Sequence, residues 1–217
     1  MHEFLFINGL SGLLIITALM VILSKKAINS AIYYAAQSFV IVVLFIFLGA
    51  QTGSGELYLW SFTAFITKVL LVPFIMYTMF RRLDDGELGS GQVMPAAFSA
   101  IGAALIVILC YAVVSGVTLP SAENLKPALA ISLAHFFLGL FCIVAQRNIL
   151  KQVFGYCLME NGSHLTLAIL APNAPELVEI GIATDAVFAV AIMAVLGTRI
   201  FGKFNSLDAG KLTTLKG

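Results

Sequence analysis

Five ionisable side chains stand inside long apolar stretches of this 217-residue sequence, where water is scarce. They are Lys68, His135, Glu160, His164 and Asp185. A charged residue at the centre of a membrane helix costs about 2.5–3.5 kcal/mol to insert, so such groups must be paired, hydrated or neutral. Several of them at similar depth on different helices favour an ion path, and a structural ion pair is the simpler alternative. The chemistry that these residue types predict is proton or ion transfer.

The polar residues around Glu160 follow helical spacing. Cys157, Glu160 and His164 recur at i, i+3 and i+7, so we expect them to share one face of a helix. Glu176 and Glu179 open the following apolar stretch. A solvated helix start, favoured by the helix dipole, is the simpler interpretation of both, and an exit group for ions is the alternative for Glu179.

Two further patterns concern how the helices would hold these groups. Pro73 follows Lys68 and cannot donate a backbone hydrogen bond to the carbonyl of Val69. That carbonyl could help hold water or the ammonium of Lys68, although a plain packing kink is an equally good interpretation. A stripe of small and polar residues also recurs on one face of the segment around His135, and it indicates close helix packing. Its members are Ala128, Ser132, His135, Gly139, Cys142 and Gln146.

Bond chemistry within this chain is not indicated. His135 and His164 on neighbouring segments could in principle ligate a b-type haem, but their depths differ and a second pair is missing, so we expect orienting or proton-relaying histidines. The three cysteines fall in apolar runs without metal-ligand or disulfide spacing. We find no iron–sulfur motif, phosphate loop or nucleophile elbow, and we expect no cofactor, no metal and no catalytic residue.

Composition identifies the surroundings of these residues. The chain is 60% hydrophobic and 11% charged, with a mean hydropathy of +1.02, whereas soluble domains carry about 25% charge. An integral membrane protein embedded in a lipid bilayer is therefore predicted. The net charge of +1 gives no electrostatic case for nucleic acid. The first apolar run lacks a basic start and a small-residue cleavage site, so we expect it to be a permanent span.

The fold class that we predict is an all-α bundle of seven transmembrane helices, because seven stretches reach the length of about 20 residues that a bilayer requires. They cover residues 4–23, 28–50, 57–80, 94–115, 126–146, 150–171 and 176–201. The longest polar stretch, residues 81–92, is the clearest loop. With seven spans, all basic loop residues except Lys126 fall on one side, which predicts an outside N-terminus and a cytoplasmic C-terminus.

The whole chain is expected to form a single membrane domain. Similar patterns recur about 120 residues apart, with Glu-Leu opening both the third and the seventh span, and they suggest a three-helix duplication. The expected parts are helices 1–3 (residues 1–82), a loop with a linking fourth helix (83–120), helices 5–7 (121–205) and a tail (206–217). The tail is expected to be frayed or held by a partner.

Three long segments closely resemble component E of hydrogenase-4, a membrane subunit of formate-hydrogenlyase-type complexes. They are SFTAFITKVLLVPFIM (61–76), LKPALAISLAHFFLGLFCIVAQRNILKQVFGYCLMENGSHL (125–165) and APELVEIGIATDAVFAV (174–190). The resemblance runs along nearly the whole chain and is dense at the polar positions.

The last three spans are also similar to the three-helix K subunit of bacterial respiratory complex I. Arg147-Asn148, Gly155, Asn161 and Asp185 fall at matching positions. One departure is clear, because the acid of the middle helix in that family falls on Cys157, and the nearest acid here is Glu160, one turn later.

These resemblances imply a non-catalytic accessory subunit in the cytoplasmic membrane of a bacterium. They imply antiporter-like subunits and the membrane anchor of a NiFe hydrogenase module as partners. Redox chemistry in such a complex would drive proton or sodium translocation. Our first hypothesis makes Glu160 and Asp185 protonatable stations, with Lys68 and His135 modulating their pKa and His164 passing protons or ordering water. A stand-alone secondary transporter and a purely structural scaffold are the alternatives.

Overall fold

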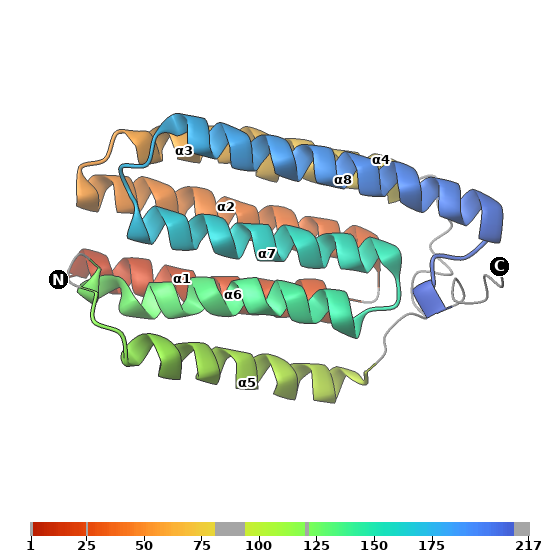
Figure 1. Ribbon diagram of the computed structural model, residues 1–217, viewed down its shortest axis with the longest axis horizontal. Coiled ribbons are helices and arrows are strands. Elements are labelled where there is room, and N and C mark those ends of the chain that lie inside the picture. The colour runs from red at the N-terminus through yellow and green to blue at the C-terminus, as the bar shows by residue number, and fades with distance from the viewer. Residues whose placement is uncertain (1, 25, 81–93, 120–121, 211–217) are drawn as a thin grey trace.

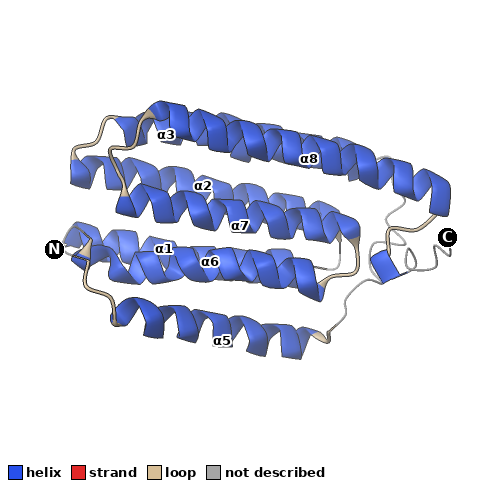
Figure 2. Ribbon diagram, viewed as in Figure 1, coloured by secondary structure: helices blue, strands red, loops and turns tan. Residues whose placement is uncertain are grey.

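Residues 2–24, 26–80, 94–119 and 122–210 are described by the computed structural model (Figure 1). The predicted loop at 81–92 lies outside them, as do the tail beyond residue 210 and the basic residues Lys25, Arg81, Arg82, Lys211 and Lys216. Within the described residues all long elements are helices and no strand is present (Figure 2), which confirms the predicted all-α class.

Seven long helical stretches make up the described part of the bundle, and each coincides with one predicted span. The first two are α1 (His2–Leu23) and α2 (Ala27–Thr52). The third consists of α3 (Glu56–Ala64), a π-helical segment (Phe65–Leu71) and α4 (Val72–Phe80). The rest are α5 (Ala96–Ser115), α6 (Lys126–Ala145), α7 (Ile149–Leu170) and α8 (Glu176–Phe204), with a short 3-10 turn (Glu123–Leu125) before α6.

Six of the seven stretches are long and apolar enough to cross a membrane, and α7 is the exception. Its 22 residues have the necessary length. Its composition is more polar than that of the other six, because it contains Lys151, Glu160, Asn161 and His164. In Figure 1 it nevertheless lies in the middle of the bundle, so its polar side chains face other helices instead of the outer surface.

The helices lie roughly parallel in a flattened bundle (Figure 1). α2 and α7 lie side by side in the centre, α1 and α6 cover one side of them, and α3, α4 and α8 cover the other. α5 packs at the edge, mainly on α6. α1 and α6 run in one direction and α2 and α7 in the opposite one, an arrangement that a parallel three-helix duplication would produce. The duplication itself stays a prediction.

Backbone contact between α6 and α7 is the tightest packing in the bundle. An added Cβ at Gly139 would lie 2.3 Å from the backbone nitrogen of Met159, and one at Gly162 would lie 2.4 Å from that of Phe136. Glycine is needed at these positions because the two backbones approach too closely for any side chain. The predicted stripe of small and polar residues on α6 is indeed buried along its whole length.

A lysine in the first turn of α7 connects this helix to the end of α1 at one end of the bundle. The Lys151 ammonium, buried in the first turn of α7, donates to the carbonyl oxygens of Val21 (3.0 Å) and Ser24 (2.5 Å) at the end of α1. Ammonium groups are favoured there because the last carbonyls of a helix lack intrahelical partners.

The described start of the tail packs on the same turn. Ala209 N–H donates to the carbonyl of Arg147 (2.9 Å), and Ile149 N–H donates to that of Leu207 (3.1 Å). The expectation that the tail is frayed or held by a partner is therefore wrong for residues 207–210, because these backbone bonds hold it on its own chain.

The α6–α7 contact generates a test of stability. Gly162→Ala places a methyl group against the backbone of Ser132 and Phe136 on α6, so we expect it to lower the free energy of unfolding by about 1–3 kcal/mol. Gly181→Ala on α8 is the control, because an added Cβ there meets nothing within 4 Å. Thermal unfolding of the purified protein in detergent compares the two, and equal transition temperatures would contradict the close contact.

Candidate functional site

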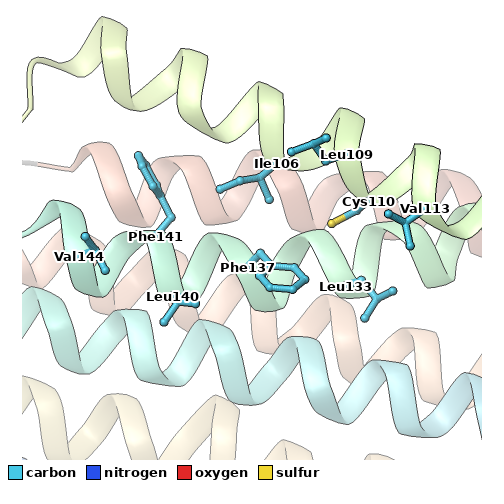
Figure 3. A pocket seen from close by; sticks show the side chains of 9 residues that line it. All are labelled: Ile106, Leu109, Cys110, Val113, Leu133, Phe137, Leu140, Phe141 and Val144. Carbon is cyan, nitrogen blue, oxygen red and sulfur yellow. The ribbon is translucent and has the colours of Figure 1, made fainter.

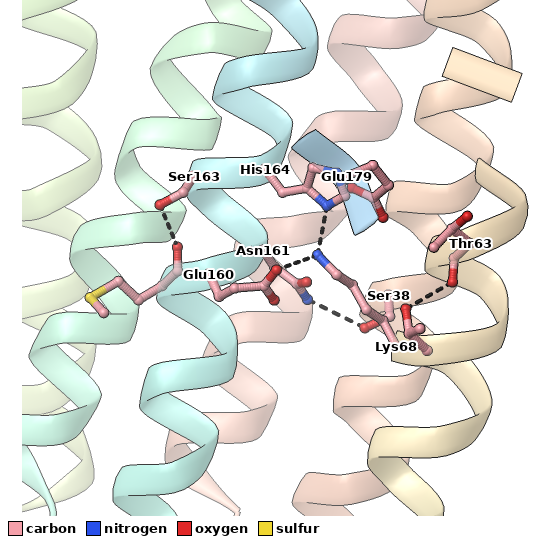
Figure 4. A network of polar contacts seen from close by, with 10 residues as sticks. Ser38, Thr63, Lys68, Glu160, Asn161, Ser163, His164 and Glu179 are labelled. Carbon is pink, nitrogen blue, oxygen red and sulfur yellow. Dashed lines mark hydrogen bonds and ion pairs between the residues drawn. The ribbon is translucent and has the colours of Figure 1, made fainter. Parts of the chain in front are cut away.

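Four of the predicted side chains meet in the centre of the bundle (Figure 4). The Lys68 ammonium lies 2.6 Å from Glu160 Oε1 and 2.6 Å from His164 Nδ1. On the other side of the imidazole, His164 Nε2 contacts Glu179 Oε2. We call these four residues the Lys68 cluster. It joins the π-helical segment, α7 and α8, which are far apart in the sequence.

The cluster is almost completely removed from the surface. Lys68, His164 and Glu179 are fully buried, and the side chain of Glu160 is 10% exposed. Burying a charge is costly unless it is paired, and removing one partner of such a pair typically costs about 3–5 kcal/mol. The ion pair between Lys68 and Glu160 is therefore the condition under which either group can stay ionised here.

The charges of the cluster leave room for one exchangeable proton. One ammonium faces two carboxyl groups, so the set is neutral when one carboxyl carries a proton. The ammonium donates to His164 Nδ1, which leaves Nε2 as the protonated nitrogen facing Glu179 in a neutral imidazole. An imidazole between an ammonium and a carboxyl group can accept a proton on one nitrogen and release one from the other.

A distortion of the helix positions Lys68. Val72 N–H bonds to the carbonyl of Thr67, five residues back, so the backbone around Lys68 is π-helical. Pro73 explains this locally, because it has no N–H for the carbonyl of Val69 and its ring would clash with that carbonyl in an α-helix. π-helical turns are frequent at functional sites. The helix distortion that Pro73 predicts is therefore a widened π-helical turn, and this turn carries Lys68.

Two aromatic rings pack against His164, and neither contact was predicted from the sequence. The ring centroid of Phe45 lies 4.6 Å from that of His164 at 68°, and Trp60 lies 5.4 Å away at 37°. Both are fully buried. Trp60 is the single tryptophan of the chain, but one aromatic residue in an apolar stretch does not reveal which residue it will contact.

His135 does not join the cluster. It is fully buried on α6, and its Nε2 contacts the side-chain amide of Gln37 on α2. His164 has neighbours at both ring nitrogens, Lys68 and Glu179, which leaves neither nitrogen available to an iron. The two histidines therefore do not form the haem-ligating pair that was weighed from the sequence.

Among the described residues, no group of three or more histidine, cysteine or acidic side chains could hold a metal ion. The three cysteines are free and buried. Cys157, where the K-subunit family has its acid, is buried in the apolar core one turn before Glu160.

Glu179 and Asp185 occupy the opposite places from those expected. Glu179 is fully buried against His164, so the interpretation as a solvated helix start is wrong for it. Asp185 is exposed on α8, outside the cluster. Six residues turn an α-helix through about 600°, so the two acids cannot face the same neighbour. Glu160 pairs with Lys68, and Asp185 lies apart from both.

A large apolar groove lies away from this chemistry, between α5 and α6 (Figure 3). Its volume is about 610 Å³, and Ile106, Phe137 and Phe141 are among its lining residues. It contains no charged side chain, so it offers nothing for ion transfer.

Comparison with known proteins agrees with these observations. Residues 127–217 match the family NADH-ubiquinone/plastoquinone oxidoreductase chain 4L. That match includes Glu160, His164 and Glu179 but not Lys68, which comes from the preceding half of the chain.

Full-length relatives are found as well. "Hydrogenase-4 component E" of Escherichia coli (strain K12) and that of Shigella flexneri are each 53% identical over 211 residues, covering 97% of both chains. An uncharacterized protein of Mycobacterium tuberculosis is 30% identical over 98 residues, 43% of this chain and 44% of its own length. No solved structure matches the chain. The identity along almost the whole length of both proteins means that this multi-pass membrane protein belongs to the hydrogenase-4 component E family.

Proposed function

We propose that this chain is a non-catalytic membrane subunit of a complex I-related NiFe hydrogenase, and that its Lys68 cluster passes protons as part of redox-driven ion translocation. The observation that carries the proposal is the buried Lys68–Glu160 ion pair, which continues through His164 to Glu179. The family relationship supports the assignment to this kind of complex, and the cluster supports the role in proton transfer. The family relationship supports the bacterial cytoplasmic membrane as the location.

The geometry of the cluster favours protons over sodium ions. A sodium site needs several oxygen ligands around the ion. Here an ammonium lies 2.6 Å from Glu160 Oε1 and occupies the place beside the carboxylate that a metal cation would take. A proton needs only a carboxyl or imidazole atom to bind to, and the cluster offers both.

The proposed topology has seven spans, with α7 carried through the bilayer by the six apolar helices around it. The described basic residues support the orientation. Lys26, Arg147, Lys151, Arg199 and Lys203 lie at the end of the bundle where α2 and α7 begin, and Lys126 lies at the other end. Because basic residues accumulate on the cytoplasmic side, the N-terminus would be outside and the C-terminus inside.

Asp185 has a different proposed role, at a junction between subunits. It lies nine residues into α8, about 13 Å from the start of the helix and near the middle of a bilayer. An exposed carboxylate at that depth is unfavourable against lipid. A neighbouring antiporter-like subunit or the membrane anchor of the hydrogenase would shield it and receive or supply its proton.

Neutralising Glu160 tests the proposal. Glu160→Gln preserves shape but cannot exchange a proton, and Glu179 remains in the cluster as the carboxylate that balances the Lys68 ammonium. We therefore expect the complex to assemble and evolve hydrogen while proton uptake per hydrogen falls at least several-fold. Inverted membrane vesicles with a fluorescent pH-gradient dye and a hydrogen electrode measure both quantities. Glu123→Gln is the matched control, because Glu123 pairs with Lys126 in an exposed position outside the cluster. Unchanged proton uptake in Glu160→Gln would refute the role of the cluster.

A double substitution separates proton transfer from a purely structural scaffold. Lys68→Met leaves Glu160 buried without its cation, and we expect destabilisation of about 3–5 kcal/mol or loss of the chain from the complex. Adding Glu160→Gln removes the uncompensated charge and should restore most of the stability and the assembly. If the cluster transfers protons, uptake stays low in the double variant. Recovery of normal uptake together with assembly would show that the ion pair only fastens the helices.

Neutralising Asp185 tests the junction. We expect Asp185→Asn to leave the unfolding temperature of the isolated chain unchanged, because the side chain is exposed, and to lower proton uptake per hydrogen in the complex. Thr184→Ala is the control at the same depth, since its hydroxyl bonds only to its own helix. Normal uptake in Asp185→Asn would exclude a station at this position.

A further inference from the structure

The apolar groove between α5 and α6 is a feature that the proposed proton transfer does not use (Figure 3). Along α6 it runs from Leu133 to Val144, and Figure 3 shows these two residues toward its opposite ends. Its walls are open to the outside of the bundle, since Leu109, Val113 and Val144 are 62%, 65% and 69% exposed. The groove therefore faces whatever surrounds this edge of the protein.

An aromatic ring keeps α5 and α6 apart at this groove. A Cβ added at Gly102 on α5 would lie 3.0 Å from Cζ of Phe141, so the ring packs directly on the backbone of α5. In contrast, α6 and α7 meet backbone to backbone at Gly139 and Gly162. The hollow beside Phe141 cannot close by bringing the two helices together. In a bilayer such a hollow is filled, because unfilled apolar walls lose their dispersion contacts.

The dimensions of the groove fit a hydrocarbon chain better than a protein helix. Leu133 and Val144 are eleven positions apart on α6, or about 16 Å, and half of a bilayer core is about 15 Å thick. Spread over that length, the volume of about 610 Å³ gives a cross-section of about 40 Å². An α-helix about 10 Å across has a cross-section of about 80 Å², so it could not enter the groove. The groove also lacks the small and polar side chains that contacts between membrane helices favour.

A basic side chain lies just beyond one end of the groove. Arg147 follows Val144 by three positions, in the connection to α7, and it is exposed. It makes no ion pair with a described residue. In the proposed topology this end is cytoplasmic, where anionic lipids attract basic residues. A guanidinium group matches a phosphate with two parallel hydrogen bonds. The groove and Arg147 together therefore fit a hydrocarbon chain about one leaflet long with an anionic phosphate at its end.

We propose that the groove binds one acyl chain of an anionic phospholipid from the cytoplasmic leaflet, and that Arg147 holds the phosphate. The choice of leaflet rests on the topology in the proposed function, whereas the binding itself does not depend on proton transfer. The bound chain fills the hollow beside Phe141 and joins α5 to α6. This contact stabilises α5 in particular, because α5 lies at the edge of the bundle and packs mainly on α6.

Thermal unfolding of the full chain in detergent tests the site without any measurement of pumping. Phosphatidylglycerol is anionic and phosphatidylethanolamine is zwitterionic, and both are added with identical acyl chains. A ligand that binds the folded state stabilises it, so we expect phosphatidylglycerol to raise the transition temperature by several degrees and phosphatidylethanolamine by clearly less. Equal rises would overturn the preference for an anionic headgroup. An equal rise with glycerol phosphate, which has no acyl chain, would overturn the groove as the site.

A bulky substitution tests the groove itself. Leu140→Trp fills the groove from one wall, so the rise caused by phosphatidylglycerol should disappear. Ile108→Trp is the matched control, because Ile108 is exposed on α5 but does not line the groove. It lies two residues, or about 200° of helix, from Ile106 in the lining, so the rise should persist. Rises of the same size in both tryptophan variants would overturn binding in the groove.

A third variant keeps the test independent of how well Leu140→Trp folds. Arg147→Gln leaves the groove open, so both phospholipids should still bind and the difference between them should disappear. A difference that persists in Arg147→Gln would overturn the assignment of the phosphate to this side chain. A long-chain quinone that raises the transition temperature as much as phosphatidylglycerol would overturn a phospholipid as the occupant. None of these outcomes depends on proton uptake in Glu160→Gln, so the lipid site and the proposed function can fail separately.

Discussion

The ion pair between Lys68 and Glu160 is the interaction on which the rest of the buried chemistry depends. Neither charge is stable alone at this depth, and each is held by the other at 2.6 Å. The pair places the ammonium against His164, and His164 then meets Glu179. Without Lys68, the carboxylate of Glu160 would be a buried charge without its cation, which is strongly destabilising.

Two features of the backbone make this pairing geometrically feasible. Glycines at the α6–α7 contact bring the two helices together until their backbones touch, which fixes the central helix that carries Glu160 and His164. The widened turn before Pro73 places Lys68 on the facing element. Phe45 and Trp60 then restrict the imidazole of His164 between them. The site is therefore built by close packing around a distortion, and little in it is free to move independently.

The cluster also joins two parts of the chain with different relationships to known proteins. Glu160, His164 and Glu179 fall in the region that matches chain 4L, whereas Lys68 falls in the helices that precede it. The earlier helices thus supply the cation that allows the later ones to carry a buried carboxylate. This division gives a physical reason for the additional helices. It is also consistent with the position of the middle-helix acid, which is Glu160 here and falls on Cys157 in the K-subunit family, because the ammonium of Lys68 contacts Glu160.

The sequence by itself determined the class of the protein, the positions of its helices and most members of the cluster. Apolar length and composition suffice for these, because a bilayer requires long apolar helices and makes every buried ionisable residue conspicuous. Only the tertiary structure decided which groups meet. Helical spacing shows which residues share a face, but it does not show which other helix lies against that face. Asp185 was expected to be one of the protonatable stations, but its side chain is exposed. Glu179, for which a solvated helix start was the simpler interpretation and an exit group the alternative, is buried on His164. The aromatic contacts of His164 and the separate place of His135 were hidden for the same reason, since contacts between distant segments depend on how the helices pack.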